Sequence, residues 1–296
     1  MMVMIAVFSW IALSGTPDMN AISSIAKAYA IPIDDKFDEQ LNQLLDEHLH
    51  LVAGQPQRDV LDEVLGVVKR IGLKTIVVEK EYVDADYLET FAFHYSKAFQ
   101  LKPSTCCRIH FFECSIEDRD FPNLSQQQRD AYLGYCILRP TGHQYISRTV
   151  LKPPHVPTGE TRFLHAAGRF RAHLFGHALH VDGAPFIEQD ANTFICAGAA
   201  IWCVALYMHA EHGAPRFYPA EITQLARSSF SHGHLRQGLT TDQIVMTLQR
   251  LGLEPRVLSY WGLQELRQKD PDAHRMLMHQ IRDFIHVTES LLDSGS

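Results

Sequence analysis

The stretch that most constrains the fold runs from Pro185 to Trp202. It begins as an extended segment, passes through a polar turn at 188–193, and continues as a helix of small and apolar residues that begins near Cys196. A cysteine in the first turn of a helix faces unpaired backbone N–H groups and the positive end of the helix dipole, and both favour the thiolate. The stretch therefore predicts a helix that presents a reactive cysteine at its start.

Gln189 lies just upstream of Cys196 and carries an amide N–H₂ donor. In a cysteine acyl-transfer site, such a donor and the backbone N–H of the cysteine together form an oxyanion hole, because they share the developing negative charge. The pattern indicates a nucleophilic Cys196 with Gln189 beside it. The alternative is a small structural cysteine buried at a helix start, since free cysteine is among the most buried residue types.

The composition is typical of a globular protein. A chain of 296 residues with 46% hydrophobic and 21% charged residues is long enough for one large or two ordinary domains. A net charge of −7 argues against a nucleic-acid binder or a protein that binds an anionic membrane, since both need a basic excess. The six cysteines form no C-x-x-C pair, which favours reduced thiols and a cytoplasmic location.

The chain begins with an apolar run, MMVMIAVFSWIALSG. The run lacks the basic start of a signal peptide and is too short to span a bilayer. We expect it to form a first strand or to precede the fold, and we expect no membrane association. The alternative is a weak signal peptide, because Ser14 and Gly15 are small enough for a cleavage site.

Three segments are predicted along the chain. Residues 1–73 carry a helical hairpin, with apolar residues at helical spacing over 34–51 and again from Val60 to Gly72. Residues 74–165 mix helix and strand. They hold an aromatic helix at 84–99 and strand patterns at KTIVVE, CRIHFFEC, YLGYCILRP and ISRTVLKP, with Arg108, His110 and Phe112 on one face of the second strand.

The third segment, 166–296, begins with a predicted hairpin at 170–183 that turns near Gly176. Its histidines, His173, His177 and His180, have a metal-like spacing. No carboxylate or cysteine completes a tetrahedral set, so we expect strand histidines and no metal. Beyond the Cys196 helix we expect a helix at 219–228, a second helix within 238–255 that is capped by Thr240 or Thr241 and stops at Gly252, a short strand at 256–261, and a last helix from Asp270.

Two other groups of charged residues have both a binding and a structural interpretation. Glu113, Glu117, Asp118 and Asp120 have the charge to bind a cation, although a solvated loop is the commoner use of such a group. Arg139 and Arg148 would form an anion site if their strands pair, although structural ion pairs are commoner.

Residues 185–260 resemble the bacterial papain-like cysteine peptidases, in particular the branch related to the leader-peptide peptidases of bacteriocin exporters. The resemblance is carried, in order, by the Gln189–Cys196 turn, the following AGAAIWCVALYM helix, and the G-L-T-x-x-Q-I-x-x-x-L-x-x-L-G pattern at 238–252. One departure is that the step from Gln189 to Cys196 is one residue longer than in the family, so Asp190 occupies the family's glutamine position.

The resemblance implies an α+β fold in which a helical segment and a mixed α/β region precede a partial papain-like domain. It implies a hydrolase that cleaves a peptide or amide bond through a Cys196 thiolate and an acyl-enzyme, with a peptide or protein substrate and no cofactor. The oligomeric state is left open.

The catalytic base is harder to place. In the family the histidine follows the cysteine on a strand. His209 and His212 share the cysteine's helix but lie roughly 20–24 Å along its axis from Cys196, which leaves His232 and His234, in a loop, as candidate bases.

Since just one short strand is expected after Cys196, the resemblance predicts an incomplete domain whose base lies outside these 296 residues. Two alternatives to a peptidase remain open. One is a catalytically incomplete module that binds a peptide or protein partner. The other is a two-part protein whose N-terminal region recognises the partner that its C-terminal part cleaves.

Overall fold

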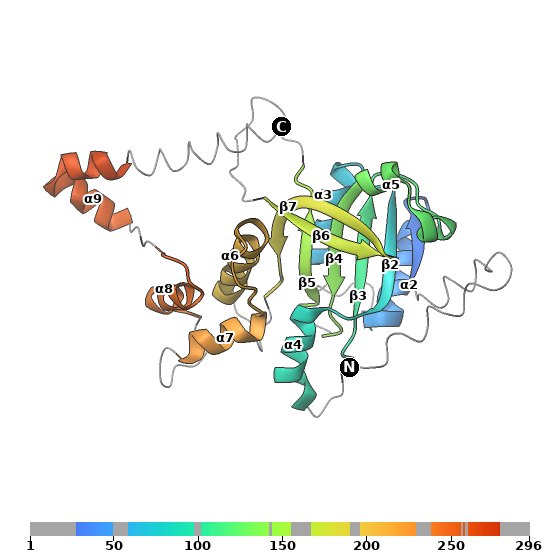
Figure 1. The fold of residues 1–296 in the computed structure, drawn as a ribbon, viewed down its shortest axis with the longest axis horizontal. Helices are drawn as coiled ribbons and strands as arrows, with labels where there is room; N and C mark the ends of the chain where they lie inside the picture. Colours follow the sequence, from blue (N-terminus) through green and yellow to red (C-terminus); the bar gives the residue numbers. More distant parts are fainter. Residues whose placement is uncertain are drawn as a thin grey trace.

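The computed structural model describes residues 28–49, 59–97, 102–141, 144–154, 167–189, 196–228, 238–255, 257 and 260–278. These residues form a mixed α/β fold around one curled antiparallel sheet (Figure 1). The sheet has the order β1-β2-β3-β4-β5-β7-β6. Its strands are β1 (Ala28–Pro32), β2 (Thr75–Tyr82), β3 (Cys106–Phe112), β4 (Tyr132–Leu138), β5 (Ile146–Leu151), β6 (Gly168–Leu174) and β7 (His177–Phe186).

The sheet separates two hydrophobic cores. Along β4, the side chains after Gly134 alternate between them: Cys136 and Leu138 belong to one core, and Tyr135 and Ile137 to the other. This alternation is the two-residue period of a strand. Because both faces are covered, every residue of β3 and β4 is buried.

One face of the sheet is covered by the helices α2 (Phe37–Leu49) and α3 (Asp59–Arg70). The two predicted helices are confirmed, and their apolar stripe faces the sheet as expected. The buried stripe consists of Phe37, Leu41, Leu44, Leu45, Leu61, Val64, Leu65 and Val68.

The other face is covered by α4 (Ala85–Phe93), α6 (Cys196–His212) and α7 (Pro219–Ser228). Here the aromatic helix is shorter than predicted, because α4 ends at Phe93 and a 3₁₀ turn, η2 (Tyr95–Lys97), follows it. Tyr87 is fully buried, and Phe91 and Tyr95 pack against the same core, so the aromatic stripe is a core feature.

Two glycines let the backbones around β5 approach closely. A Cβ on Gly134 would lie 2.1 Å from the carbonyl oxygen of Val150, and one on Gly183 would lie 2.2 Å from that of Leu151. Gly134 also has a φ of +125°, a conformation that side chains rarely allow. Glycine is therefore required on both strands that flank β5.

The C-terminal part of the described chain is helical. Helix α8 (Thr241–Arg250) is capped by the Thr240 side chain, which accepts from the backbone N–H of Gln243, and the chain turns at Gly252 with a φ of +82°. Both boundaries agree with the sequence-based expectation. Residues 271–278 are helical after Asp270, whose carboxylate accepts from the backbone N–H of Ala273 at 2.9 Å.

The predicted strand at 256–261 is wrong at its last two residues, while residues 256, 258 and 259 lie outside the described residues. Tyr260 and Trp261 begin the helix α9 (Tyr260–Lys269) instead. Aromatic residues favour strands, but the following run, LQELRQK, consists largely of strong helix formers. The described residues after Cys196 consequently contain no strand.

The sheet draws on all three segments predicted from the sequence. Strand β1 comes from 1–73, strands β2 to β5 from 74–165, and strands β6 and β7 from 166–296. The boundaries of those segments remain a prediction, and the apolar run at the N-terminus lies outside the described residues.

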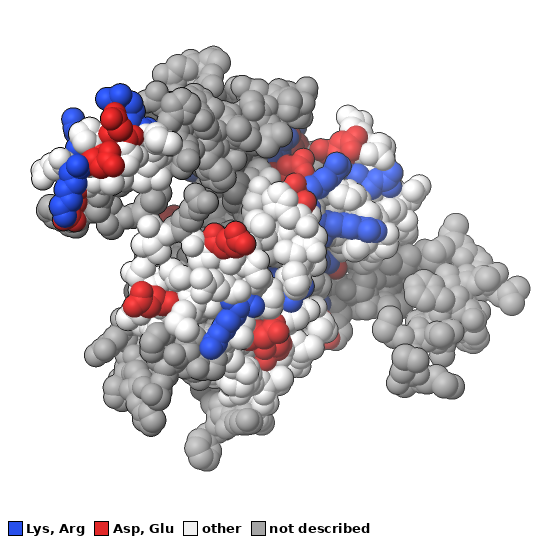
Figure 2. All heavy atoms as spheres, turned by 60° about the vertical axis from the view of Figure 1, so that its left-hand side comes forward, with Lys and Arg blue, Asp and Glu red and all other residues white. Residues whose placement is uncertain are grey.

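The side of the molecule that carries α6 to α9 has described acidic and basic side chains interspersed among uncharged ones (Figure 2). Within the described ranges, none of the helices combines the length and apolar character needed to cross a bilayer.

Candidate functional site

The candidate site lies where β7 leads towards α6. After Phe186 the chain is anchored to the start of β5, because the backbone N–H of Glu188 donates to the carbonyl of Ile146 at 3.1 Å. The Glu188 carboxylate in turn accepts from the N–H of Ile146 at 3.0 Å, and the Arg139 guanidinium donates to the Glu188 carbonyl at 3.2 Å. Gln189 is thus held next to a fixed point of the sheet.

Cys196 is the first residue of α6, and its side chain is exposed. Its thiol donates a hydrogen bond to Oε1 of Gln189. The structure therefore brings together the two residues that the sequence singled out, and exposure contradicts the alternative of a buried structural cysteine. Residues 190–195, including Asp190, lie outside the described residues.

Either the oxygen or the nitrogen of the Gln189 amide can occupy the position that faces the Cys196 thiol. A half-turn about the last side-chain bond exchanges oxygen and nitrogen, so the same position presents an acceptor to a thiol or a donor to an oxyanion. The backbone N–H of Cys196 is at the start of a helix, where N–H groups have no partner within the helix. A side-chain amide and a helix-start N–H are the kinds of donor that an oxyanion hole combines.

A buried carboxylate fixes α6 against the sheet. Trp202, one and a half turns after Cys196, is fully buried, and its indole N–H donates to Oδ1 of Asp86 in α4 at 3.3 Å. Arg216, just after α6, donates to the same oxygen, and Nη1 of Arg148 in β5 lies 3.1 Å from Oδ2. The position of α6 against the sheet is therefore set by charged contacts as well as by packing.

The neighbouring Asp84 belongs to the same cluster. It accepts from Nη2 of Arg148 at 2.8 Å and caps α4 through the backbone N–H of Tyr87. Burial raises the pKa of the Asp84 carboxyl, although Arg148 acts in the opposite direction.

The other five cysteines differ from Cys196 in their surroundings. Cys106, Cys107 and Cys136 are buried, and Cys114 and Cys203 are half-buried. Burial raises the pKa of Cys203 to about 11 and those of Cys107 and Cys136 to about 12. A thiol that stays protonated is a poor nucleophile. Because burial raises the pKa of these thiols, the exposed Cys196 differs from them.

The candidate bases, His232 and His234, lie outside the described residues. His209 contacts the carbonyl of Ala214 through Nδ1 at 2.7 Å, and His212 packs edge-on against Tyr207, both near the far end of α6. No histidine of the described ranges hydrogen-bonds to the Cys196 thiol.

The sequence predicted only part of a buried polar network inside the sheet. Arg108 and His110 share one face of β3 as expected, and both contact Oε2 of Glu79 in β2, at 2.5 and 2.8 Å. His110 Nδ1 lies 2.8 Å from the hydroxyl of Tyr132, and Arg108 also donates to the carbonyl of His173 at 2.6 Å. The missing signal was the strand register, which pairs Glu79 with Arg108.

The pKa values in this network follow from burial. Burial lowers the pKa of the His110 ring; Glu79 opposes this shift and Arg108 adds to it. For Glu79, burial alone would raise the pKa, but the hydrogen bond and charge of His110 and the charge of Arg108 outweigh it, so the pKa is lowered. In this network the His110 ring lies between the Glu79 carboxylate and the Tyr132 hydroxyl.

The charged groups considered as binding sites have structural partners. Arg148 pairs with Asp84 and Asp86, and Arg139 donates to backbone carbonyls. In the acidic group, Asp118 accepts from the N–H of Ala30 in β1 at 2.8 Å.

The hairpin at Gly176 is confirmed, and His177 accepts a 3.3 Å hydrogen bond from the N–H of Leu124 through Nε2. Among the described residues, no three His, Cys, Asp or Glu side chains are grouped to hold a metal ion.

No protein-family model, curated protein or solved structure matches this chain. Function is therefore inferred from the residues of the chain itself.

Proposed function

We propose that this protein is a cysteine peptidase-like protein in which Cys196 attacks a peptide or amide bond. The observation that carries the proposal is the exposed thiol at the first residue of α6, in contact with the side chain of Gln189. A nucleophile, a side-chain amide and a free backbone N–H at one helix start are the parts an acyl-transfer site needs.

The reaction follows from these parts. The Cys196 thiolate attacks the carbonyl carbon, and the electron pair of the C=O bond moves to oxygen, where the amide of Gln189 and the N–H of Cys196 stabilise it. The C–N bond then breaks, the amine leaves with a proton from a general acid, and a thioester remains on Sγ. Water hydrolyses the thioester and restores the thiol.

A papain-like arrangement accounts for the order of these elements. An extended segment leads to Gln189, and Cys196 begins a long helix packed on a sheet. In this proposal the candidate bases within the chain are His232 and His234, and the histidines of α6 are excluded because they are too far along the helix to reach Sγ.

Labelling at low pH tests the proposal. At pH 6 a free thiol is almost wholly protonated, whereas a thiolate held by an imidazolium reacts readily. We expect iodoacetamide to label Cys196 rapidly at pH 6, as followed by mass spectrometry. We also expect His232→Ala or His234→Ala to slow the labelling about 10²-fold or more, the usual contribution of general acid–base groups.

The matched control is His274→Ala, because His274 lies on the helix at 271–278, which is not part of the proposed site. That variant should label at the unchanged rate. Labelling of Cys196 at pH 6 no faster than that of the unfolded chain would contradict the peptidase proposal.

The second candidate is a catalytically incomplete papain-like module that binds a peptide or protein partner. It is favoured by the hydrogen bond that the Cys196 thiol makes, which goes to Gln189. It predicts slow labelling that neither histidine variant changes, so the same experiment separates the two functions.

A further inference from the structure

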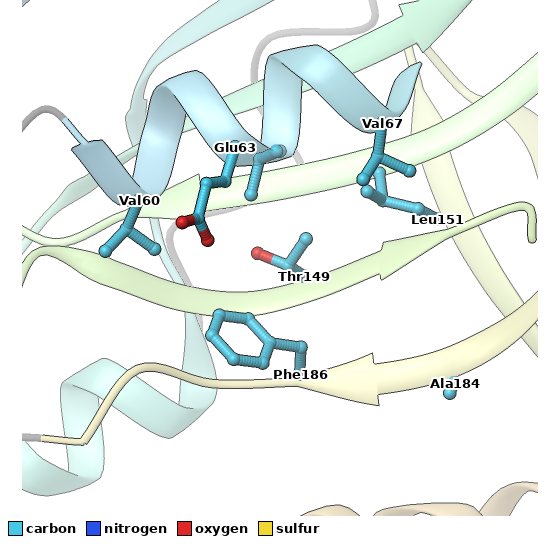
Figure 3. A pocket seen from close by; sticks show the side chains of 8 residues that line it. Val60, Glu63, Val67, Thr149, Leu151, Ala184 and Phe186 are labelled. Atoms are coloured by element: carbon cyan, nitrogen blue, oxygen red, sulfur yellow. The ribbon is translucent and has the colours of Figure 1, made fainter. Parts of the chain in front are cut away.

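A groove of about 220 Å³ lies on the face of the sheet opposite α6, between α3 and the ends of β5 and β7 (Figure 3). One face of α3 forms its upper wall, and the two strands form its floor and lower wall. The lining residues are Val60, Glu63, Val64, Val67, Thr149, Leu151, Ala184 and Phe186.

The size of the groove limits its occupant. Pockets for drug-sized ligands and cofactors run from about 300 to 1,000 Å³, so a space of about 220 Å³ suits one long side chain. The walls are mostly aliphatic, which favours a side chain with an apolar stem.

Glu63 is the charged residue of the lining. Its carboxylate points from α3 towards the sheet (Figure 3), and it makes no ion pair or hydrogen bond with any other described residue. A carboxylate at an apolar groove attracts a cation whose stem covers the apolar wall.

Phe186 faces Glu63 across the groove (Figure 3) and is 44% exposed, a large value for a phenylalanine. The face of an aromatic ring attracts a cation, more often the guanidinium of arginine than the ammonium of lysine. A planar guanidinium can stack on a ring while its N–H groups form a bidentate pair with a carboxylate. Phe186 and Glu63 together therefore fit arginine better than lysine.

We propose that this groove binds an arginine side chain of a peptide or protein partner. Its methylene stem lies against Val60, Val64 and Leu151, and its guanidinium lies between the Phe186 ring and the Glu63 carboxylate. The inference is independent of any chemistry at Cys196, because the groove is on the other face of the sheet.

The test uses two small probes, N-acetyl-arginine methylamide and its neutral isostere N-acetyl-citrulline methylamide. Methyl NMR spectra of the full chain report binding through Val60, Val64, Val67 and Leu151. We expect the arginine probe to shift these methyl signals and to bind about fivefold to tenfold more tightly than the citrulline probe, because the uncharged isostere loses the cation–π and ionic contacts.

Glu63→Gln should narrow the difference between the two probes, because it removes the ionic contact and leaves only the cation–π contact with the Phe186 ring. The control is Glu39→Gln, the same substitution at an exposed position of α2 outside the groove, which should leave the difference between the probes intact.

Two results would overturn the proposal. The first is equal binding of both probes, and the second is methyl shifts confined to other parts of the chain.

Discussion

Cys196 is exposed, whereas the other cysteines of this chain are buried or half-buried. We therefore expect Cys196 to be the most reactive of them. The thiolate is the reactive form, and burial raises the pKa of Cys203 to about 11. Cys114 is half-buried with a raised pKa. Only Cys196 combines a helix-start position with an open approach for a reagent.

We therefore expect a short exposure to iodoacetamide at pH 8 to alkylate Cys196 before any other cysteine. Peptide mass spectrometry gives the order of modification. Cys196→Ser should leave the native chain almost unlabelled, while unfolding in urea should make the remaining thiols react at similar rates. Modification of Cys203 or Cys114 ahead of Cys196 would contradict this assignment.

Because the His110 ring is buried, we expect the free energy of unfolding to decrease in mild acid. Burial holds the folded pKa of His110 below its unfolded value of about 6.5. Above that pH the ring is neutral in both states and contributes no pH dependence. As the pH falls through about 6.5 towards the folded pKa, only the unfolded state takes up the proton, so the free energy of unfolding decreases.

The slope from this single group is at most about 1.4 kcal/mol per pH unit. Urea unfolding between pH 7 and pH 5 measures it, and His110→Gln should reduce the slope by that amount, whatever its effect on absolute stability. An unchanged slope in the variant would show that His110 is not the group that titrates.

At the scale of single residues, local pattern predicted the Cys196–Gln189 contact because both residues flank one turn. Local pattern could not predict that Glu79 is the partner of Arg108 and His110, because Glu79 reaches them only through the pairing of β2 with β3. Long-range register of this kind depends on packing across the whole sheet.

Among the elements, the same substitution is expected to have opposite effects in β4 and in α3. Gly134→Ala would place a Cβ 2.1 Å from the Val150 carbonyl at a φ of +125°, and the backbone strain alone costs about 1–3 kcal/mol. Gly66 lies inside α3 with nothing within 4 Å of an added Cβ, so Gly66→Ala should stabilise the fold by about 0.5–1 kcal/mol.

Thermal unfolding of the two variants checks both signs in one experiment. A neutral Gly134→Ala would mean that β4 and β5 are not as close as described. A destabilising Gly66→Ala would mean that α3 is more tightly covered at that point.

Element type was predictable wherever the hydrophobic period was long and clear, as in the hairpin of α2 and α3. The helix of 219–228 was also predicted with its observed limits, since Pro219 lies in its first turn. The error at 256–261 arose because a short aromatic run favours a strand, while helix formation at Tyr260 depends on the residues that follow it. Helix α4 ended early for a similar reason, since the end of an aromatic stripe has no local stop signal.

At the scale of the whole molecule, Asp86 ties the part of the chain that forms most of the sheet to the part that carries Cys196. It is almost completely buried and contacts Arg148 in β5, Trp202 in α6 and Arg216 after α6. Asp86→Ala would leave two guanidinium groups without their shared carboxylate, and removing one partner of a buried ion pair costs about 3–5 kcal/mol.

Urea unfolding should show this loss as a lower midpoint. A matched surface change, Asp242→Asn on the exposed face of α8, should stay within about 0.5 kcal/mol of the parent protein. A comparably small effect of Asp86→Ala would mean that packing alone positions α6.

The order of the strands could not have been predicted from the sequence. The chain gives strand positions, but β7 inserts between β5 and β6, and this order arises from the long strand β7 pairing with β6 along its first part and with β5 along its last part. That pairing also fixes the start of the segment that leads to Gln189.

The central claim is that Gln189 and Cys196 form one acyl-transfer site, and a ratio of two rates tests it most directly. Acylation of Cys196 by p-nitrophenyl acetate passes through an oxyanion, whereas alkylation by iodoacetamide does not. The acylation rate divided by the alkylation rate, followed at Cys196 by mass spectrometry, therefore isolates stabilisation of the oxyanion.

Gln189→Ala should lower this ratio about 10²-fold to 10³-fold, the usual effect of losing one oxyanion donor. The control, Gln249→Ala on the exposed surface of α8, should leave the ratio unchanged. If the ratio at Cys196 stays the same in Gln189→Ala, Gln189 stabilises no oxyanion and the proposed site is wrong.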